Sequence, residues 1–165
     1  MHTGHQYHEF FLTSPRDLRT RDRFLRLAMD RLPPGADVLD FGAGTGIDAK
    51  YYASQGHRTF VYEPSDAMRE CLTEYCGDEI GRHCVIPVSS TLACRVPAIT
   101  ANFAVFNHFD RLGPLFARLA SVVERGGFIL ASMLNPWCIT HRVTTKPIDA
   151  GMSHRSMRPK CVYQG

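Results

Sequence analysis

Residues 38–46 read Val-Leu-Asp-Phe-Gly-Ala-Gly-Thr-Gly, and this stretch decides the fold of the chain. An apolar run leads into Asp40, three glycines follow at alternate positions, and a helix-like segment begins at Ile47. The pattern predicts a buried parallel strand, a tight glycine turn and the N-terminus of a helix. Glycines in such a turn let the backbone bend sharply and bring its amides close to a ligand.

A second predicted strand, residues 58–62, delivers Glu63 to the same edge of the sheet. In a doubly wound sheet, the carboxyl ends of adjacent parallel strands form the crevice where ligands bind. A carboxylate at that edge can accept hydrogen bonds from the two hydroxyls of a ribose. The sequence therefore predicts an α/β protein with a doubly wound, mostly parallel sheet, helices on both faces and a nucleoside-containing ligand.

The glycine loop indicates which nucleoside ligand to expect. The dinucleotide fingerprint is G-x-G-x-x-G, and here Ile47 stands where its last glycine would fall. Asp40 would repel a pyrophosphate but suits a cationic amino group. S-adenosylmethionine carries an amino group and a sulfonium and no phosphate. A nucleotide-dependent oxidoreductase is the alternative that Ile47 disfavours.

These residues resemble the class I S-adenosylmethionine-dependent methyltransferases, in which D-x-G-x-G-x-G is followed by an acid at the end of the next strand. The resemblance covers roughly residues 7–137 and includes the segments 64–68, 102–108 and 122–128. It implies S-adenosylmethionine as the cofactor and a small molecule as the methyl acceptor. It also implies a set of cofactor-binding residues: Asp40, Gly42, Ala43, Gly44, Gly46, Glu63, Pro64, Met68, Phe106 and Asn107.

The resemblance names no catalytic residue. Methyl transfer from a sulfonium is an in-line displacement, so the protein mainly aligns the acceptor and excludes water. A general base helps where the acceptor atom is oxygen or nitrogen, and His108 and Tyr7 are the candidate side chains. A histidine that is simply satisfied within its loop is the alternative for His108. In many family members an acid after the third strand binds the adenine amino group, where this chain has Ser89-Ser90-Thr91.

Hydrophobic periodicity and the positions of glycine and proline predict the remaining helices and strands. We expect helices over 14–32, 48–55, 65–76 and 114–124 and strands over 83–86, 102–106 and 128–133. Pro97 argues against an earlier fourth strand, because proline cannot donate to a central ladder. Six arginines between Arg16 and Arg31 predict a solvated helix face, partly paired with nearby aspartates.

Composition bounds the remaining possibilities. The chain has 165 residues, 44% of them hydrophobic, which suits one globular domain with a core. A net charge of +3 gives no argument for nucleic acid or a membrane surface. No apolar run reaches transmembrane length, residues 1–10 are no signal peptide, and the six cysteines include no C-x-x-C pair, so we expect a cytoplasmic protein with reduced thiols.

The two ends of the chain complete the domain prediction. We interpret 1–13 as a mobile N-terminal segment, 14–137 as the cofactor-binding domain and 138–165 as a basic, poorly patterned tail. His2, His5 and His8 could hold a metal on a helix, but we expect no metal.

The end of the chain shapes the last expectation. The resemblance implies a further helix and antiparallel strands, for which residues 134–165 are too few, so the protein resembles an abridged member of the family. Its last strand would then be an exposed edge that invites self-association. A non-catalytic, cofactor-binding remnant that acts through a partner chain is the alternative.

Overall fold

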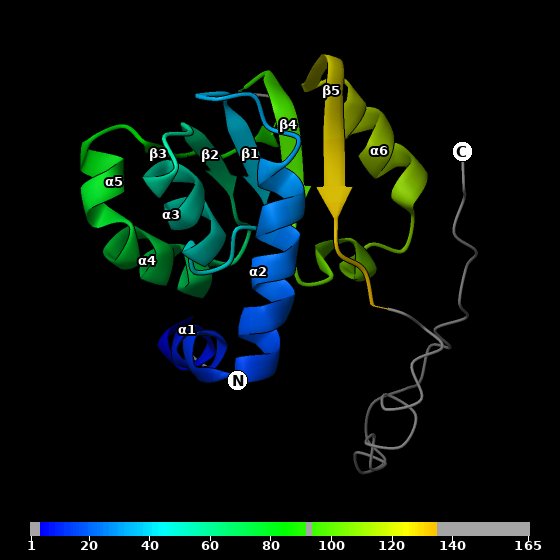
Figure 1. Ribbon diagram of the computed structural model, residues 1–165. Helices are drawn as coiled ribbons and strands as arrows, with labels where there is room; N and C mark the ends of the chain where they lie inside the picture. Colours follow the sequence, from blue (N-terminus) through cyan, green and yellow to red (C-terminus); the bar gives the residue numbers. More distant parts are fainter. Residues whose placement is uncertain (1–3, 92–93, 135–165) are drawn as a thin grey trace, which may run out of the picture. The chain divides into compact units, whose positions relative to one another are not determined.

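The computed structural model describes residues 4–91 and 94–134, and its centre is a five-stranded sheet (Figure 1). The strand order is β3-β2-β1-β4-β5, and all four pairings are parallel. The strands are β1 Val38–Phe41, β2 Thr59–Tyr62, β3 Val85–Pro87, β4 Val96–Ala101 and β5 Val123–Ala131. The strand order reverses between β1 and β4, which confirms the doubly wound α/β fold and places a ligand crevice there.

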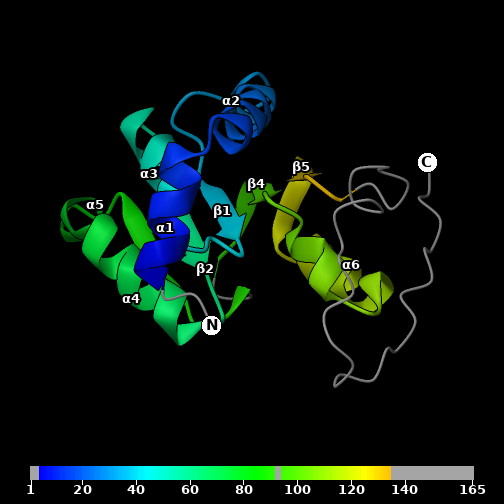
Figure 2. The same ribbon diagram turned by 90° about the horizontal axis from the view of Figure 1, so that it is seen from below.

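Helices cover both faces of this sheet. They are α1 Gly4–Thr13, α2 Pro15–Met29, α3 Ile47–Ser54, α4 Asp66–Tyr75, α5 Gly77–Gly81 and α6 Leu112–Ala120, with a 3-10 helix at Val105–His108. Figure 2 shows α2 and α3 on one side of the sheet and α6 on the other. Residues of β1 alternate accordingly: Val38 packs with Leu25 and Ala28 of α2, whereas Leu39 packs with Leu119 of α6.

The start of α2 follows the predicted chemistry. Ser14 accepts a hydrogen bond from the backbone N–H of Asp17 at 3.4 Å, and Pro15 occupies the first helical position. Leu25 and Ala28 then carry the buried face of the helix onto the sheet. The predicted helix 48–55 likewise appears as α3 and the helix 65–76 as α4, each within two residues of the expected bounds.

The prediction for the fourth strand is wrong. β4 is Val96–Ala101, not 102–106, and it includes Pro97. The pairing of β4 with β5 shifts register between Val96 and Ala98, and pairing with β1 begins only at Ala98. Proline is tolerated because the irregularity spares it from donating to either ladder. Phe103 and Ala104 then adopt left-handed φ angles of 55° and 62°, which end the strand.

The prediction of a mobile N-terminal segment is also wrong for residues 4–13. These residues form α1, which lies at the bottom of Figure 1, on the side where the strands end, and contacts α4 and α2. Gly4 packs so closely on α4 that a Cβ would lie 2.3 Å from the carbonyl oxygen of Ala67. The ring of Phe11 meets the ring of Phe103 edge-on at 4.8 Å. Aromatic packing therefore fixes a segment whose histidines and polar residues suggested a solvated end.

The observed bounds of β3, α6 and β5 also differ from the predicted ones. Pro87 lies inside β3, which pairs only with β2 in the described part of the sheet, so the proline faces no second ladder. Helix α6 ends at Ala120 rather than 124, and α5 is an additional short helix. β5 begins at Val123, but its continuous pairing runs over residues 128–131, within the predicted strand.

β5 is the last strand in the sheet order, as predicted. The self-association that we expect from this edge stays a prediction, as do the domain boundaries. The predicted tail, 138–165, lies outside the described residues. The cysteines within the described residues, Cys71, Cys76, Cys84 and Cys94, are free thiols. No helix in the described ranges is long and apolar enough to cross a membrane.

Candidate functional site

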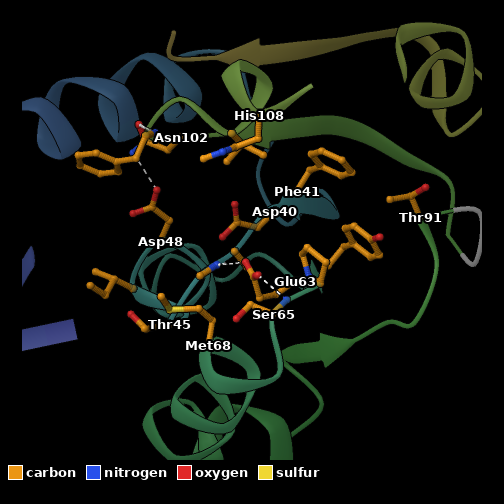
Figure 3. Close-up of a pocket in the computed structure, with 18 of the residues that line it drawn as sticks. Asp40, Phe41, Thr45, Asp48, Glu63, Ser65, Met68, Thr91, Asn102 and His108 are labelled. Atoms are coloured by element: carbon orange, nitrogen blue, oxygen red, sulfur yellow. Dashed lines mark hydrogen bonds between the residues drawn. The ribbon is translucent and has the colours of Figure 1, made fainter. Parts of the chain in front are cut away.

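A cavity of about 590 Å³ lies at the carboxyl ends of β1, β2 and β4 (Figure 3). Its walls come from the glycine loop, the end of β2, the turn after β4, and helices α1, α2, α4 and α6. The lining residues that carry the argument below are Tyr7, Arg21, Asp40, Gly44, Asp48, Glu63, Met68, Thr91, Asn102, Phe103 and His108. The position is the crevice that the reversal of strand order predicts.

The glycine loop is tied to the end of β2. The backbone N–H groups of Gly42 and Ala43 both donate to the carbonyl oxygen of Tyr62, at 2.8 and 3.1 Å. Gly44 has a left-handed φ of 56°, and the atom nearest to a Cβ built on it, Tyr7 Cε1, would be 4.0 Å away. Gly44 therefore turns an open backbone surface toward the cavity, where a ligand can approach closely.

Glu63 is held in place by two backbone amides. Its Oε2 accepts a hydrogen bond from Gly44 at 2.8 Å, and its Oε1 accepts one from Ser65 at 2.9 Å (Figure 3). Each carboxylate oxygen can accept at least one more hydrogen bond. The side chain is thus a rigid acceptor at the strand end, suited to a pair of adjacent hydroxyls.

Asp40 is the buried acid of the site. The residue is 2% exposed, and its Oδ2 has no hydrogen-bond partner within residues 4–91 and 94–134. Burial, and then the negative charge of Asp48, raise the pKa of the Asp40 carboxyl well above its ordinary value. An orphaned buried carboxyl in a cavity wall fits a ligand group that carries positive charge.

A polar network supports the opposite wall. Arg21 of α2 forms an ion pair with Asp48 of α3, and their side chains are only 11% and 6% exposed. Asn102 donates from Nδ2 to Asp48 at 2.9 Å, and its Oδ1 accepts from the Ser132 hydroxyl at 2.8 Å. The Arg21 guanidinium also lies 4.6 Å from the ring centre of Phe103. The network fixes the turn after β4 against two helices.

Helix α1 closes the cavity from the strand ends. His8 Nδ1 lies 2.8 Å from the Thr45 hydroxyl of the glycine loop, within hydrogen-bond distance. Burial lowers the pKa of His8, which favours the neutral imidazole. Tyr7, the residue before His8, lines the cavity, and burial raises the pKa of its hydroxyl. Tyr7 is therefore a neutral phenol in this site rather than a phenolate.

Most predicted site residues meet in this cavity, and three do not. Those that line it are Tyr7, Asp40, Gly42, Ala43, Gly44, Glu63, Pro64, Met68 and His108. Gly46 does not line the cavity. It packs against α4 and its C-terminus instead, where a Cβ on Gly46 would lie 2.7 Å from the Cys76 sulfur. Phe106 is 1% exposed in the core under α6, and Asn107 is exposed. The early end of β4 explains these two, since both fall in the 3-10 helix rather than in a strand.

Sequence reasoning missed Arg21, Asp48, Asn102 and Phe103. The arginine pattern places Arg21 on the solvated face, although its spacing from Leu25 and Ala28 puts it on the buried stripe of α2. That periodicity could have revealed it. Thr91 lies in the segment after β3, where many family members have an acid, and it lines the cavity on the side away from Asp48 (Figure 3). Across the described residues, no group of three His, Cys, Asp or Glu side chains could hold a metal ion.

Comparison with known proteins agrees with this geometry. The methyltransferase domain family matches residues 12–159 of the chain. The chain therefore belongs to this family, and its fold is the Rossmann-like fold of class I S-adenosylmethionine-dependent methyltransferases. No curated protein matches the chain in sequence.

Three similar solved structures show the extent of the likeness. DesVI of Streptomyces venezuelae is 20% identical with a TM-score of 0.63, over 78% of this chain and 56% of DesVI. The CcbJ methyltransferase of Streptomyces caelestis is 25% identical with a TM-score of 0.59, over 78% and 55%. Phosphoethanolamine N-methyltransferase 2 of Haemonchus contortus, solved with S-adenosylmethionine, is 19% identical with a TM-score of 0.66, over 79% and 33%. The chain thus spans little more than half the length of DesVI and CcbJ.

Proposed function

We propose that this chain is an S-adenosylmethionine-dependent methyltransferase that acts on a small-molecule acceptor in the cavity at the strand ends. One observation carries the proposal. An open glycine turn lies between Asp40, a buried carboxyl whose Oδ2 has no hydrogen-bond partner among the described residues, and a rigid hydrogen-bond acceptor, Glu63. A ligand with a positive charge at one place and a ribose at another satisfies both.

The residues present suit the donor cofactor, which supplies a methyl group on a positively charged sulfur. Glu63 would accept hydrogen bonds from the ribose hydroxyls, and Asp40 would balance the positive charge. Pro64 and Met68 offer apolar surface beside Glu63 for the base. Gly44 lets the backbone approach without a side chain in the way. Asp40 is the penultimate residue of β1 and Glu63 directly follows the neighbouring strand β2, so both side chains line the same cavity.

The chain's own part in methyl transfer is alignment and the exclusion of water. α1 covers the strand ends, and Tyr7 reaches into the cavity from it. We assign Tyr7 to holding the acceptor by a hydrogen bond, since its buried phenol stays protonated. We assign His108, which lines the same cavity and is exposed, to taking a proton from the acceptor and passing it to solvent.

The roofed cavity favours a small molecule over a macromolecular acceptor. A polymer chain would have to pass α1, which is anchored at Gly4, His8 and Phe11 by packing and a hydrogen bond. The name of the similar phosphoethanolamine N-methyltransferase supports a small acceptor as well. A location in the cytoplasm and the absence of nucleic-acid partners remain predictions from composition.

Titration calorimetry with S-adenosylmethionine and with NAD tests the donor assignment. We expect S-adenosylmethionine to bind one to one and NAD not to bind, because Ile47 stands where the dinucleotide fingerprint needs its last glycine. NAD binding would support the oxidoreductase alternative instead. Formation of S-adenosylhomocysteine with a panel of small amines and phenols then separates an enzyme from a cofactor-binding remnant. Tight binding without turnover on any acceptor would favour the remnant.

A further inference from the structure

The three carboxyl groups of the cavity differ in how their charge is balanced. Asp48 has the guanidinium of Arg21 and the amide of Asn102. Glu63 has the backbone N–H groups of Gly44 and Ser65. Asp40 has neither a cation nor an amide on its Oδ2 among the residues that the structure describes. Its charge is therefore the one that the empty site leaves uncompensated.

The surroundings of Asp40 disfavour a negative charge from several sides. The carboxyl is buried, and it faces the carboxylates of Asp48 on α3 and Glu63 after β2. Within the described residues, the cation that acts on Asp40 is Arg21 of α2, which is already paired with Asp48. Figure 3 shows Asp40 in the middle of the labelled site residues, between His108 and Glu63.

The elements beneath Asp40 offer no positive charge either. Tyr52 of α3 and Thr100 of β4 are both fully buried, and the Thr100 hydroxyl, which acts to lower the pKa of Asp40, carries no charge that could balance a carboxylate. Thr100 is the register partner of Asp40 in the neighbouring strand. Burial and the nearby carboxylates raise the pKa of Tyr52 as well, so this group stays neutral. A neutral carboxyl suits these surroundings, because an isolated buried charge is costly.

We propose that Asp40 carries a proton in the empty site and loses it when the positively charged donor binds, so that cofactor binding releases a proton. The inference rests on the proposed function, since it needs a cationic ligand. The O–H bond of the Asp40 carboxyl breaks, its electron pair remains on the carboxylate, and the proton leaves to solvent. The ligand's positive charge takes the place of the proton beside Asp40.

Release of this proton makes the affinity for S-adenosylmethionine depend on pH. Below the pH at which empty Asp40 ionises, the donor must displace a proton, so its association constant rises up to about tenfold per pH unit. Above that pH the carboxyl is already ionised, and the association constant becomes flat. A site whose acid is ionised throughout would show no such rise from Asp40.

Calorimetry in several buffers measures the proton directly. S-adenosylmethionine is titrated into the protein at a series of pH values below 7, where its amino group stays protonated, in phosphate, MES and imidazole. The slope of observed enthalpy against buffer ionisation enthalpy gives the protons exchanged. We expect a net release that approaches one proton for the parent chain and none for Asp40→Asn. His8→Gln serves as the matched control, because a histidine contribution would vanish there and an Asp40 contribution would not.

A second measurement covers the case in which Asp40→Asn binds too weakly or fails to fold. Infrared difference spectra of the parent chain, with and without S-adenosylmethionine, should show loss of a protonated carboxyl band and gain of a carboxylate band. Binding without proton release and without this spectral change would overturn the inference and leave the donor assignment intact. Failure of S-adenosylmethionine to bind at any pH would overturn the proposed function and the inference with it.

Discussion

The backbone N–H of Gly44 donates a hydrogen bond of 2.8 Å to Oε2 of Glu63, so the loop after β1 and the end of β2 form one unit. The glycine conformation brings the amide within reach, and the carboxylate, also bonded to Ser65, cannot rotate away. The two most informative features of the sequence, the glycine turn and the spaced acid, are thus physically joined.

Replacement of this acid tests the ribose assignment. Glu63→Ala should weaken S-adenosylmethionine binding by roughly 2–3 kcal/mol, the scale for losing hydrogen bonds to a charged group. Calorimetry measures the change, and Glu70→Ala, at an exposed position of α4 outside the cavity, is the control. Parent-like affinity in a folded Glu63→Ala protein would remove Glu63 from the donor site.

The buried acid should make the empty protein less stable as the pH rises. Burial raises the pKa of Asp40 in the folded protein above its value in the unfolded chain. Protonated Asp40 therefore makes its whole contribution to the free energy of unfolding when the pH is below the pKa of the unfolded chain. That contribution is lost as the pH rises toward the folded pKa, by up to about 1.4 kcal/mol per pH unit. Asp40→Asn should remove this loss.

Urea unfolding of parent and variant between pH 4 and 8 measures the effect. Glu70→Gln, an exposed substitution on α4, should leave the pH dependence of the parent chain unchanged. Curves for the parent and Asp40→Asn that stay parallel across this range would show that Asp40 ionises in the folded protein as it does in the unfolded chain.

The ion pair behind the cavity should matter for folding. Arg21→Ala leaves the carboxylate of Asp48 buried without its cation, which should cost about 3–5 kcal/mol of unfolding free energy. Adding Asp48→Asn should recover part of the loss, because the uncompensated charge disappears. Arg19→Ala, at an exposed position of the same helix, should change stability by less than about 0.5 kcal/mol. Equal effects of Arg21→Ala and Arg19→Ala would mean that the pair contributes nothing.

Sequence reasoning succeeded where one local pattern determined the structure. The apolar run into Asp40, the glycine turn and Glu63 predicted the sheet edge and most of the residues that line the cavity. It failed where a distant contact decided: the register shift beside Pro97 made an early β4 possible, and this moved Phe106 away from the cavity. α1 is likewise held by side chains of other elements, as in the contact of Phe11 with Phe103. The sequence around a residue does not reveal which residues distant in the chain will contact it.

The outer strand gives a prediction about assembly. Among the described strands β5 ends the sheet order, and residues 128–131 read Phe-Ile-Leu-Ala, an apolar run without charge or proline. Such an edge is a template for pairing with another chain, so we expect association that grows with concentration. Light scattering over a concentration range checks this, for the full chain and for a chain ending at Trp137. A strictly monomeric protein in both forms would refute the exposed-edge argument, and association only after shortening would show that the tail covers the edge.

The position of the bound cofactor is the central prediction for this cavity. A crystal structure of the chain with S-adenosylhomocysteine, the product of the donor, would show this without any knowledge of the acceptor. We predict that the ribose hydroxyls contact Glu63, that the amino acid end lies on the side of Asp40, and that α1 covers the ligand. A nucleoside bound elsewhere, or a ribose away from Glu63, would contradict the assignment of this cavity as the donor site.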